Sequence, residues 1–278
     1  MKHKAVAILF LSLALLYEPS AFGQFLPQEV AARDEIERFL LTAEILRTEP
    51  IGEGVTKPTK VTLGKEGIEG KAVWKNPSGM LFGFQDGWQY ENAAYRMDKL
   101  IGLNMVPPTA ERALNGKKGS LQYWVETECS LLDLQERGTS IPESARESTD
   151  RMKYVARAFD SLIANEDRTQ QNVRYTRDWR TILIDHSRSF RSGREFTVKL
   201  LFGPRGTRKN TDGRPFLYRR LPRAFVDSLK AMTFESVKGA VGTYLTDVEI
   251  RSLLARRDLL LEDVAEMIKA QGEGQVLY

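Results

Sequence analysis

NEDRTQQNVRYTRDWRTILIDHSRSF, residues 165–190, is the stretch that decides the fold of this chain. Within it, residues 173–176 and 181–184 are rich in β-branched and aromatic side chains, which predicts two short strands. The turn-forming pair Arg-Asp follows the first strand, so we expect the two to form a hairpin. The preceding residues 152–163 place apolar side chains at helical spacing. The sequence therefore predicts a buried helix, a polar loop and a hairpin, in that order.

The polar residues of this stretch are placed for phosphate chemistry. A hairpin brings the start of its first strand beside the end of its second, so Asn172 and Asp185 are expected at one edge. Their oxygens are the hard ligands that Mg²⁺ prefers beside phosphates. Asp167, on the loop before the hairpin, can orient an acceptor hydroxyl and take its proton. The spacing Asp-x₄-Asn, followed by an aspartate at a strand end, is typical of protein kinases.

Two upstream residues complete this hypothesis. Residues 72–75, AVWK, read as a strand that ends in Lys75, the residue type that pairs with the α- and β-phosphates of ATP. Glu91 lies on the next predicted helix, residues 89–101, and is the expected ion-pair partner of this lysine. Lys71 shares a strand face with Lys75, so the alternation of the strand does not separate the two lysines.

A glycine-containing turn precedes the first clear strand. Gly52 and Gly54 stand in the sequence IGEG and are predicted to cover the phosphates of ATP. An ordinary turn is an equal interpretation, because a single Gly-x-Gly is common in turns.

The motifs carry a family resemblance. DRTQQN at residues 167–172 and LIDHSRSF at residues 183–190 resemble the catalytic and metal motifs of the phosphatidylinositol 3-/4-kinase-like superfamily, especially its bacterial members. The same pair of motifs is similar to that of the secreted Golgi casein-kinase family. Thr169 stands where the lipid kinases have His, and Ser187 stands where the metal motif usually has Gly.

This resemblance extends over residues 51–261 and implies a two-lobed, protein-kinase-like fold with ATP and Mg²⁺ or Mn²⁺ as cofactors. It implies a strand-rich N-lobe at residues 24–126, which carries Lys75 and Glu91. A helical C-lobe at residues 127–278 would carry Asp167 as the catalytic residue and Asn172 and Asp185 as the metal ligands.

The remaining pattern independently predicts an α+β protein. Residues 27–46 have helical spacing, residues 61–63 and 72–75 read as strands, and residues 120–125 as another. Beyond residue 131 the chain is mostly helical, and Thr246 followed by Glu249 predicts a capping box for the last long helix. A strand-rich half followed by a helical half favours two lobes.

The first residues have a different character. Residues 1–23 combine a basic start, an apolar run and small residues at the cleavage position, which predicts a signal peptide and export to the periplasm or the exterior.

Cys129 is the only cysteine, so no disulfide can form within the chain. With His186 as the single histidine after the leader, a zinc site of Cys and His ligands is excluded, and a Ser-His hydrolase would need His186 as its base.

Charge gives one further hypothesis. The formal net charge is only +4, so no specific nucleic-acid partner is expected. From Arg188 to Arg223, however, eleven Lys or Arg residues face two acids. This basic stretch follows the predicted metal motif, where a kinase receives its acceptor, and can hold an acidic peptide, an anionic sugar or a membrane surface. A solvated flexible loop is the alternative interpretation.

The sequence thus predicts an exported kinase that transfers the γ-phosphoryl group of ATP to a hydroxyl of a protein, lipid or saccharide. Two other functions stay open: a pseudokinase that binds a nucleotide or a partner, and an enzyme of the same fold that transfers AMP. Thr169 and Ser187 are the residues that favour the pseudokinase, because they depart from the family pattern.

Overall fold

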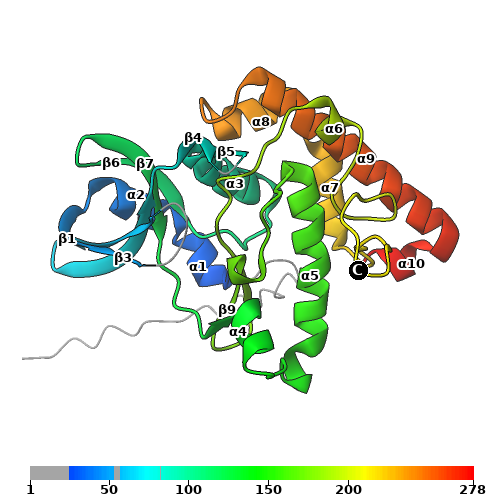
Figure 1. Ribbon diagram of the computed structural model, residues 1–278, viewed down its shortest axis with the longest axis horizontal. Coiled ribbons are helices and arrows are strands. Elements are labelled where there is room, and N and C mark those ends of the chain that lie inside the picture. Colours follow the sequence, from blue (N-terminus) through cyan, green and yellow to red (C-terminus); the bar gives the residue numbers. More distant parts are fainter. Residues whose placement is uncertain (1–24, 53–56, 82) are drawn as a thin grey trace, which may run out of the picture.

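The computed structural model describes residues 25–52, 57–81 and 83–278 (Figure 1). The predicted signal peptide, residues 1–23, and Gly54 of the predicted phosphate-covering turn lie outside these residues. An antiparallel sheet lies at one end of the molecule, and a group of helices lies at the other end. This is the α+β class that the sequence predicts.

The first half of the chain builds the sheet and three helices. In order, its elements are α1 (Pro27–Ala31), α2 (Arg33–Thr42), β1 (Glu44–Pro50), β2 (Thr59–Lys65), β3 (Ile68–Lys75), β4 (Ser78–Leu81), β5 (Phe84–Gly87), α3 (Trp88–Ile101), β6 (Thr109–Leu114) and β7 (Lys117–Tyr123). Five of the strands pair antiparallel in the order β1-β2-β3-β7-β6, and β4 and β5 form a separate hairpin. Glu66 and Gly67, which join β2 to β3, both have positive φ (51° and 79°), as a tight two-residue hairpin turn requires.

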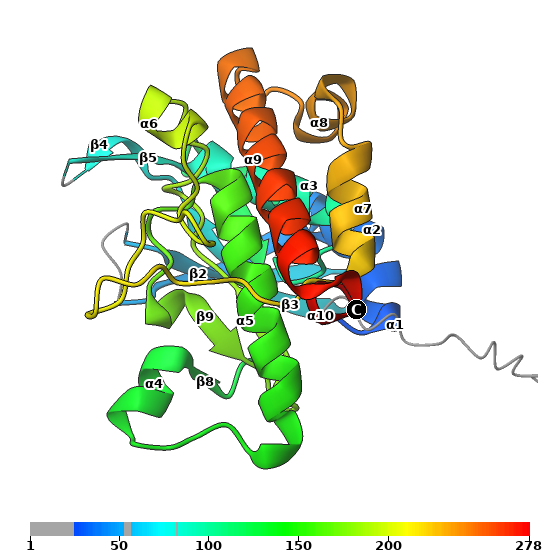
Figure 2. The same ribbon diagram turned by 90° about the vertical axis from the view of Figure 1, so that its right-hand side faces the viewer.

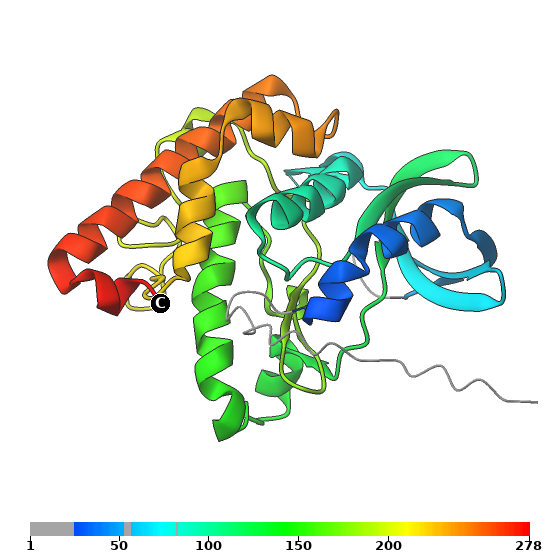
Figure 3. The ribbon, with the colours of Figure 1, turned by 180° about the vertical axis from the view of Figure 1, so that it is seen from behind.

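One face of the sheet is covered by α2. Val61 and Leu63, two residues apart on β2, are fully buried, as is Ala72 on β3, and Trp74 on β3 is 8% exposed. They pack in one cluster with Leu40 of α2, which lies against the sheet in the view from behind (Figure 3). The alternation read from the sequence therefore marks the buried face of the sheet.

The predicted helix at residues 27–46 is wrong at its end. Helix α2 stops at Thr42, Ala43 is extended, and Glu44–Pro50 is strand β1. The helical spacing of the apolar residues continues past Thr42, but pairing of β1 with β2 satisfies the backbone of this segment and overrides it. The sequence also gave no indication of β6 or of the β4–β5 hairpin.

Helix α3 links the two parts of the molecule. It is capped at its C-terminal end by Gly102, whose left-handed φ of 66° lets its N–H donate to the carbonyl of Asp98, as is common for a glycine after a helix. Its apolar side, including Ala94 and Met97, belongs to the larger core of the helical part, although the helix also contacts β6 and β7. A residue on α3 is thus held between sheet and helices.

The second half of the chain is mainly helical. Its elements are β8 (Cys129–Ser130), α4 (Leu131–Glu136), α5 (Glu143–Ile163), the 3₁₀ turn η1 (Gln170–Asn172), β9 (Val173–Tyr175), β10 (Thr181–Leu183), α6 (Arg194–Thr197), α7 (Arg223–Ala231), α8 (Phe234–Val241), α9 (Asp247–Gln271) and α10 (Glu273–Val276). The predicted capping box is confirmed, because Thr246 accepts the N–H of Glu249 at the start of α9.

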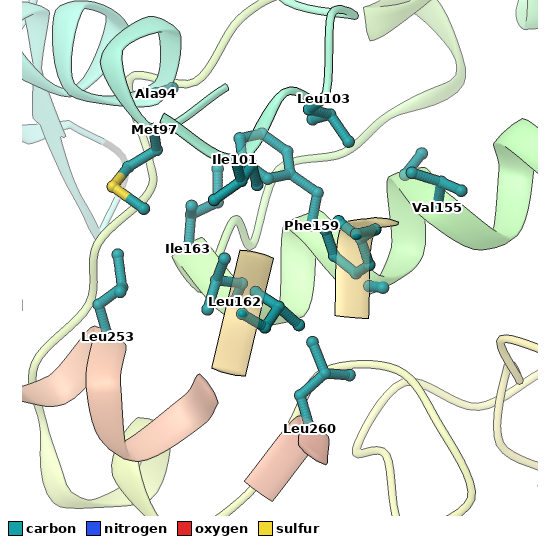
Figure 4. Close-up of a cluster of buried hydrophobic side chains, with 14 of the residues drawn as sticks. Ala94, Met97, Ile101, Leu103, Val155, Phe159, Leu162, Ile163, Leu253 and Leu260 are labelled. Atoms are coloured by element: carbon teal, nitrogen blue, oxygen red, sulfur yellow. The ribbon is translucent and has the colours of Figure 1, made fainter. Parts of the chain in front are cut away.

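Helices α5 and α9 form the centre of this part and lie side by side (Figure 2). Phe159 and Leu162 of α5 pack with Leu253 and Leu260 of α9 and with residues of α3 (Figure 4). Burying such side chains stabilises the fold by roughly 1.5–3 kcal/mol each. The C-terminal end of α5 is therefore a rigid base for the loop that follows it. Among the described residues, no helix is both long and apolar enough to cross a membrane.

Candidate active site

The predicted hairpin is present, and the start of its first strand lies beside the end of its second strand. Strands β9 and β10 pair antiparallel with Val173 opposite Leu183. One step further, the N–H of Ile184 donates to the carbonyl of Asn172 at 3.2 Å. Asn172 and Asp185 therefore lie beside each other at the end of the hairpin that faces α5 and α3. Asp185 has a left-handed φ of 61°, a conformation that non-glycine residues adopt only when the surroundings enforce it.

Lys75 reaches this edge from the sheet. Its Nζ lies 2.9 Å from Oε1 of Glu91 on α3 and 3.2 Å from Oδ1 of Asp185. The rival, Lys71, points elsewhere and pairs with Glu126 at 3.0 Å on the surface. Of the two lysines that the sequence could not separate, only Lys75 meets the hairpin.

This cluster is buried on one side and open on the other. The side chain of Glu91 is 1% exposed, whereas that of Asp185 is 32% exposed. Burial alone would lower the pKa of Lys75, but the carboxylates of Asp185 and Glu91 outweigh it and raise that pKa above its ordinary value. Burial likewise opposes ionisation of Glu91, yet Lys75 and His186 hold the pKa of Glu91 below its ordinary value. Lys75 and Glu91 are therefore both charged at neutral pH.

Asp167 lies on the loop between α5 and η1. Its side chain is 36% exposed, and Oδ2 is 3.5 Å from Nη1 of Arg188. Partial burial raises the pKa of Asp167; Arg188 opposes this, and the charges of Asp185 and Asp86 add to it. The side-chain amide of Asn172 donates to the backbone carbonyl of Asp167 at 3.0 Å, which fixes the loop to the hairpin. An accessible carboxylate with a raised pKa is suited to accepting a proton.

Arg168 is a residue whose role the sequence did not reveal. Its Nε and Nη2 donate to the buried carboxylate of Asp160, and its Nη1 donates to the carbonyls of Asn172 and Ile184 at 2.9 and 2.7 Å. Nη2 also lies 2.8 Å from Nε2 of His186. These contacts engage the five N–H donors of a guanidinium. Arg168 thus ties α5, the loop and both strands of the hairpin together.

His186 is fully buried beside this arginine. A guanidinium has only donors, so Nε2 of His186 accepts and its ring proton lies on Nδ1, 3.6 Å from Oε2 of Glu91. Burial lowers the pKa of His186, and the ring is neutral at pH 7. Its backbone N–H also donates to Glu91 at 3.0 Å. A fully buried imidazole whose Nε2 is engaged by Arg168 cannot serve a Ser-His hydrolase, so that alternative is discarded.

The loop after Asp185 is fastened to strand β5. The hydroxyl of Ser187 donates to Oδ1 of the buried Asp86 at 2.8 Å, and Nε of Arg188 donates to Oδ2 at 3.0 Å. The N–H of Gly87 donates to the carbonyl of Ser187 at 3.0 Å. Ser187, a departure from the family pattern, is therefore part of the anchor. No sequence signal pointed to Asp86, because its contact to Ser187 spans 101 positions.

The predicted basic stretch is not one free surface. Several of its cations have partners: Arg188 pairs with Asp86, Arg191 with Glu166, Arg205 with Asp263 and Arg223 with Glu273. Among these pairs, Arg205–Asp263 joins the segment between β10 and α7 to α9, and Arg188–Asp86 joins it to β5. The flexible-loop interpretation does not fit these anchored positions.

The predicted phosphate-covering turn is described only in part. Gly52 follows β1 with φ 76°, and a side chain there would meet no other atom within 4 Å. Gly52 therefore has the backbone conformation of a turn, and the role of this turn over the phosphates stays a prediction.

Solved structures of other proteins share this architecture. No family model and no curated protein sequence matches the chain. A structure of hydra Fam20 with sugar has a TM-score of 0.61 at 14% identity, covering 89% of this chain and 92% of that one. The Golgi casein kinase with Mn/ADP bound has a TM-score of 0.61 at 14% identity, covering 89% and 78%.

The Helicobacter pylori proinflammatory kinase CtkA has a TM-score of 0.54 at 11% identity, covering 84% of this chain and 96% of that one. Identities this low show the fold alone. The narrower resemblance to phosphatidylinositol 3-/4-kinases stays a prediction. The chain therefore has a kinase-like α+β fold, with Lys75, Glu91 and Asp185 in contact between its sheet and its helices.

Proposed function

We propose that this protein is an exported, ATP-dependent kinase that transfers the γ-phosphoryl group to a hydroxyl of a protein, lipid or saccharide. The observation that carries the proposal is the contact of Lys75 with both Glu91 and Asp185, at 2.9 and 3.2 Å. It joins a strand, a helix and a hairpin that lie far apart in the sequence. The proposed lobes are residues 24–126 and 127–278, with the site between them.

The donor set fits a nucleotide with a divalent metal. Asp185 and Asn172 offer a carboxylate and an amide at one edge, and Asp185 keeps a third of its side chain accessible. Within the described parts of the chain, no group of three or more His, Cys, Asp or Glu side chains could hold a metal unaided. Sites that share Mg²⁺ with substrate phosphates need only one or two protein ligands. When bound, Mg²⁺ or Mn²⁺ would neutralise phosphate charge at this edge.

The residues of the chain then have separable roles. Lys75 would bind phosphate oxygens with its ammonium, and Glu91 keeps it directed at the site. Asp167 would orient the acceptor hydroxyl and take its proton, while the acceptor oxygen bonds to the γ-phosphorus and the bond to the leaving ADP oxygen breaks. Arg188 holds Asp167 in place from the side, and Arg168 holds the loop and hairpin in register. Catalysis would rest on position and electrostatics.

The similar structures support the finer parts of this proposal. One was solved with Mn/ADP bound, which supports a nucleotide and a divalent metal here. Another was solved with sugar, which supports an acceptor that carries hydroxyl groups. The name Golgi casein kinase supports a role in an exported compartment, in line with the predicted signal peptide.

The test uses the purified protein with Mg²⁺ or Mn²⁺ and ATP labelled at either the γ or the α position. Transfer of γ label to a protein, lipid or saccharide acceptor, absent in Asp167→Asn, supports the kinase. Transfer of α label instead would establish AMP transfer. Nucleotide binding with no turnover of either label, across all acceptors, would establish a pseudokinase and overturn the proposal.

A further inference from the structure

A cavity outside the candidate active site lies beside the loop that carries Asp167. Its volume is about 400 Å³, within the range of small-molecule sites. Helix α5, the loop residues Arg168 and Thr169, strand β9 and the segment from Phe202 to Phe216 surround it. None of the roles proposed above uses this cavity.

The wall of the cavity carries an excess of positive charge. Four cations line it, Lys153, Arg157, Arg168 and Arg208, against two carboxylates, Asp150 and Asp160. Both carboxylates are already engaged, Asp150 by Lys153 at 2.5 Å and Asp160 by Arg168 at 3.0 Å. The other two guanidinium groups, those of Arg157 and Arg208, make no direct ion pair with a carboxylate of the described residues.

Arg157 is the more unusual of these two. Its guanidinium lies 5.1 Å from the ring centre of Phe216 and 6.0 Å from that of Phe202, and Nη1 donates to the carbonyl of Leu217 at 2.6 Å. Burial lowers the pKa of Arg157, which reflects the cost of removing this cation from water. A half-buried cation that makes no direct ion pair gains when an anion binds beside it.

Arg208, on the segment from Phe202 to Phe216, also lines this cavity. It donates to the backbone carbonyl of Glu166, next to Asp167, and makes no ion pair among the described side chains. Its side chain is exposed, so it can rotate toward a ligand without disrupting packed neighbours. Arg157 and Arg208 thus form a pair of donors suited to a carboxylate or a phosphate group.

Much of the remaining wall is apolar, although Thr149, Gln170 and Thr181 also line it, and the apolar part decides the kind of anion. Apolar and aromatic side chains from four parts of the chain line it: Leu131, Ile141, Val173, Tyr175, Phe202 and Phe216. A simple inorganic ion would leave these surfaces uncovered, whereas an alkyl or aryl group would bury them. We propose that the cavity binds a small amphipathic anion, a carboxylate or phosphate ester attached to an apolar body.

Binding of an anion in this cavity would act on the loop between α5 and η1, which carries Asp167. Arg168 and Thr169 line the cavity, and Arg168 holds the carbonyls of Asn172 and Ile184 in the hairpin. A bound anion would therefore restrain the loop that presents Asp167. This inference goes beyond the proposed function, because binding at the cavity requires neither ATP nor phosphoryl transfer.

The experiment titrates the purified protein by calorimetry with octanoate and, separately, with 3-phenylpropanoate, which distinguish an alkyl from an aryl body. We expect one saturable site for at least one of the two, and 1-octanol and inorganic phosphate each bound at least tenfold more weakly. Arg157→Met should weaken carboxylate binding at least tenfold and Arg208→Met severalfold. Arg194→Met, an exposed arginine outside the cavity, is the matched control and should bind as the wild type does.

Arg157 also supports the segment from Phe202 to Phe216, so its loss can disturb the fold. Arg157→Lys keeps the charge and should retain part of the affinity, and the wild-type titration stands without any variant. Hydrogen exchange at residues 166–172 should slow when the carboxylate binds. The proposal is overturned if neither carboxylate binds, if 1-octanol or phosphate binds equally well, or if folded Arg157→Met binds as the wild type does.

Discussion

Two clusters of buried charge lie within a few residues of each other, and they differ in how completely they are satisfied. In the first, Lys75, Glu91 and Asp185 meet between sheet and helices, and Asp185 keeps 32% of its side chain exposed. In the second, Arg168 uses its N–H groups on Asp160, His186 and two backbone carbonyls, and only 8% of its side chain is exposed.

This difference separates a cluster suited to binding a ligand from a cluster that stabilises the fold. An incompletely satisfied cluster at the surface can exchange its contacts for those of a ligand. A satisfied, buried cluster has nothing to exchange and instead fixes the position of its neighbours. The open cluster is therefore where we expect chemistry, and the closed cluster is where we expect stability. The following variants test this division.

The largest effect is expected from Arg168→Met. Among the described residues, the change leaves the carboxylate of Asp160, which is 1% exposed, with only the side-chain amide of Asn165 as a hydrogen-bond donor. Removing one partner of a buried ion pair costs about 3–5 kcal/mol of unfolding free energy. Urea denaturation followed by circular dichroism measures the loss. Lys118→Met, which breaks an exposed pair with Glu111, serves as the control and should be indistinguishable from the wild type. A loss as small as that of the control would mean that the closed cluster does not support the fold.

Asp185→Asn should have the next largest effect, on activity. Asparagine keeps the shape and tolerates the positive φ at this position, so the fold should be retained. Losing one charge that acts on the reacting phosphates costs about 10²–10³ in rate. Initial rates of γ-phosphoryl transfer across a Mg²⁺ titration measure it, with a higher Mg²⁺ requirement expected. Wild-type rates and an unchanged Mg²⁺ requirement would remove Asp185 from the site.

A double variant sharpens the comparison further. Lys75→Met leaves the buried carboxylate of Glu91 with the N–H of His186 and little else, so the single variant should be destabilised. Adding Glu91→Gln removes the stranded charge. We expect a coupling of about 1–3 kcal/mol in the unfolding free energies, while transfer stays lost in the double variant because the lysine is absent. Additive losses would show that the two side chains do not depend on each other in the folded protein.

The smallest effect is expected from Ser187→Ala. Its hydroxyl is one of two side-chain donors to the buried Asp86, and Arg188 remains as the other. Leaving an acceptor partly unsatisfied costs about 1–2 kcal/mol, read from the shift in the urea midpoint. Ser192→Ala, an exposed serine of the same segment, is the control. An unchanged midpoint for Ser187→Ala would show that this residue is a neutral replacement for glycine.

The sequence was sufficient where the signal is local. The capping box of α9 and the β9–β10 hairpin each depend on residues a few positions apart. The kinase-like α+β class also follows from the sequence, because strand-rich and helix-rich halves and a motif of fixed spacing are visible without coordinates. Strand β1 was missed, because its partner strand outweighs its own helical pattern.

Only the tertiary structure decided which charges meet. It selected Lys75 over Lys71, placed neutral His186 between Arg168 and Glu91, and brought Asp86 to Ser187. The physical reason is that backbone periodicity fixes the face on which a side chain lies, whereas an ion pair depends on how whole elements pack. Side chains separated by about a hundred positions leave no local pattern. Their pairing appears only when sheet, helices and hairpin are assembled.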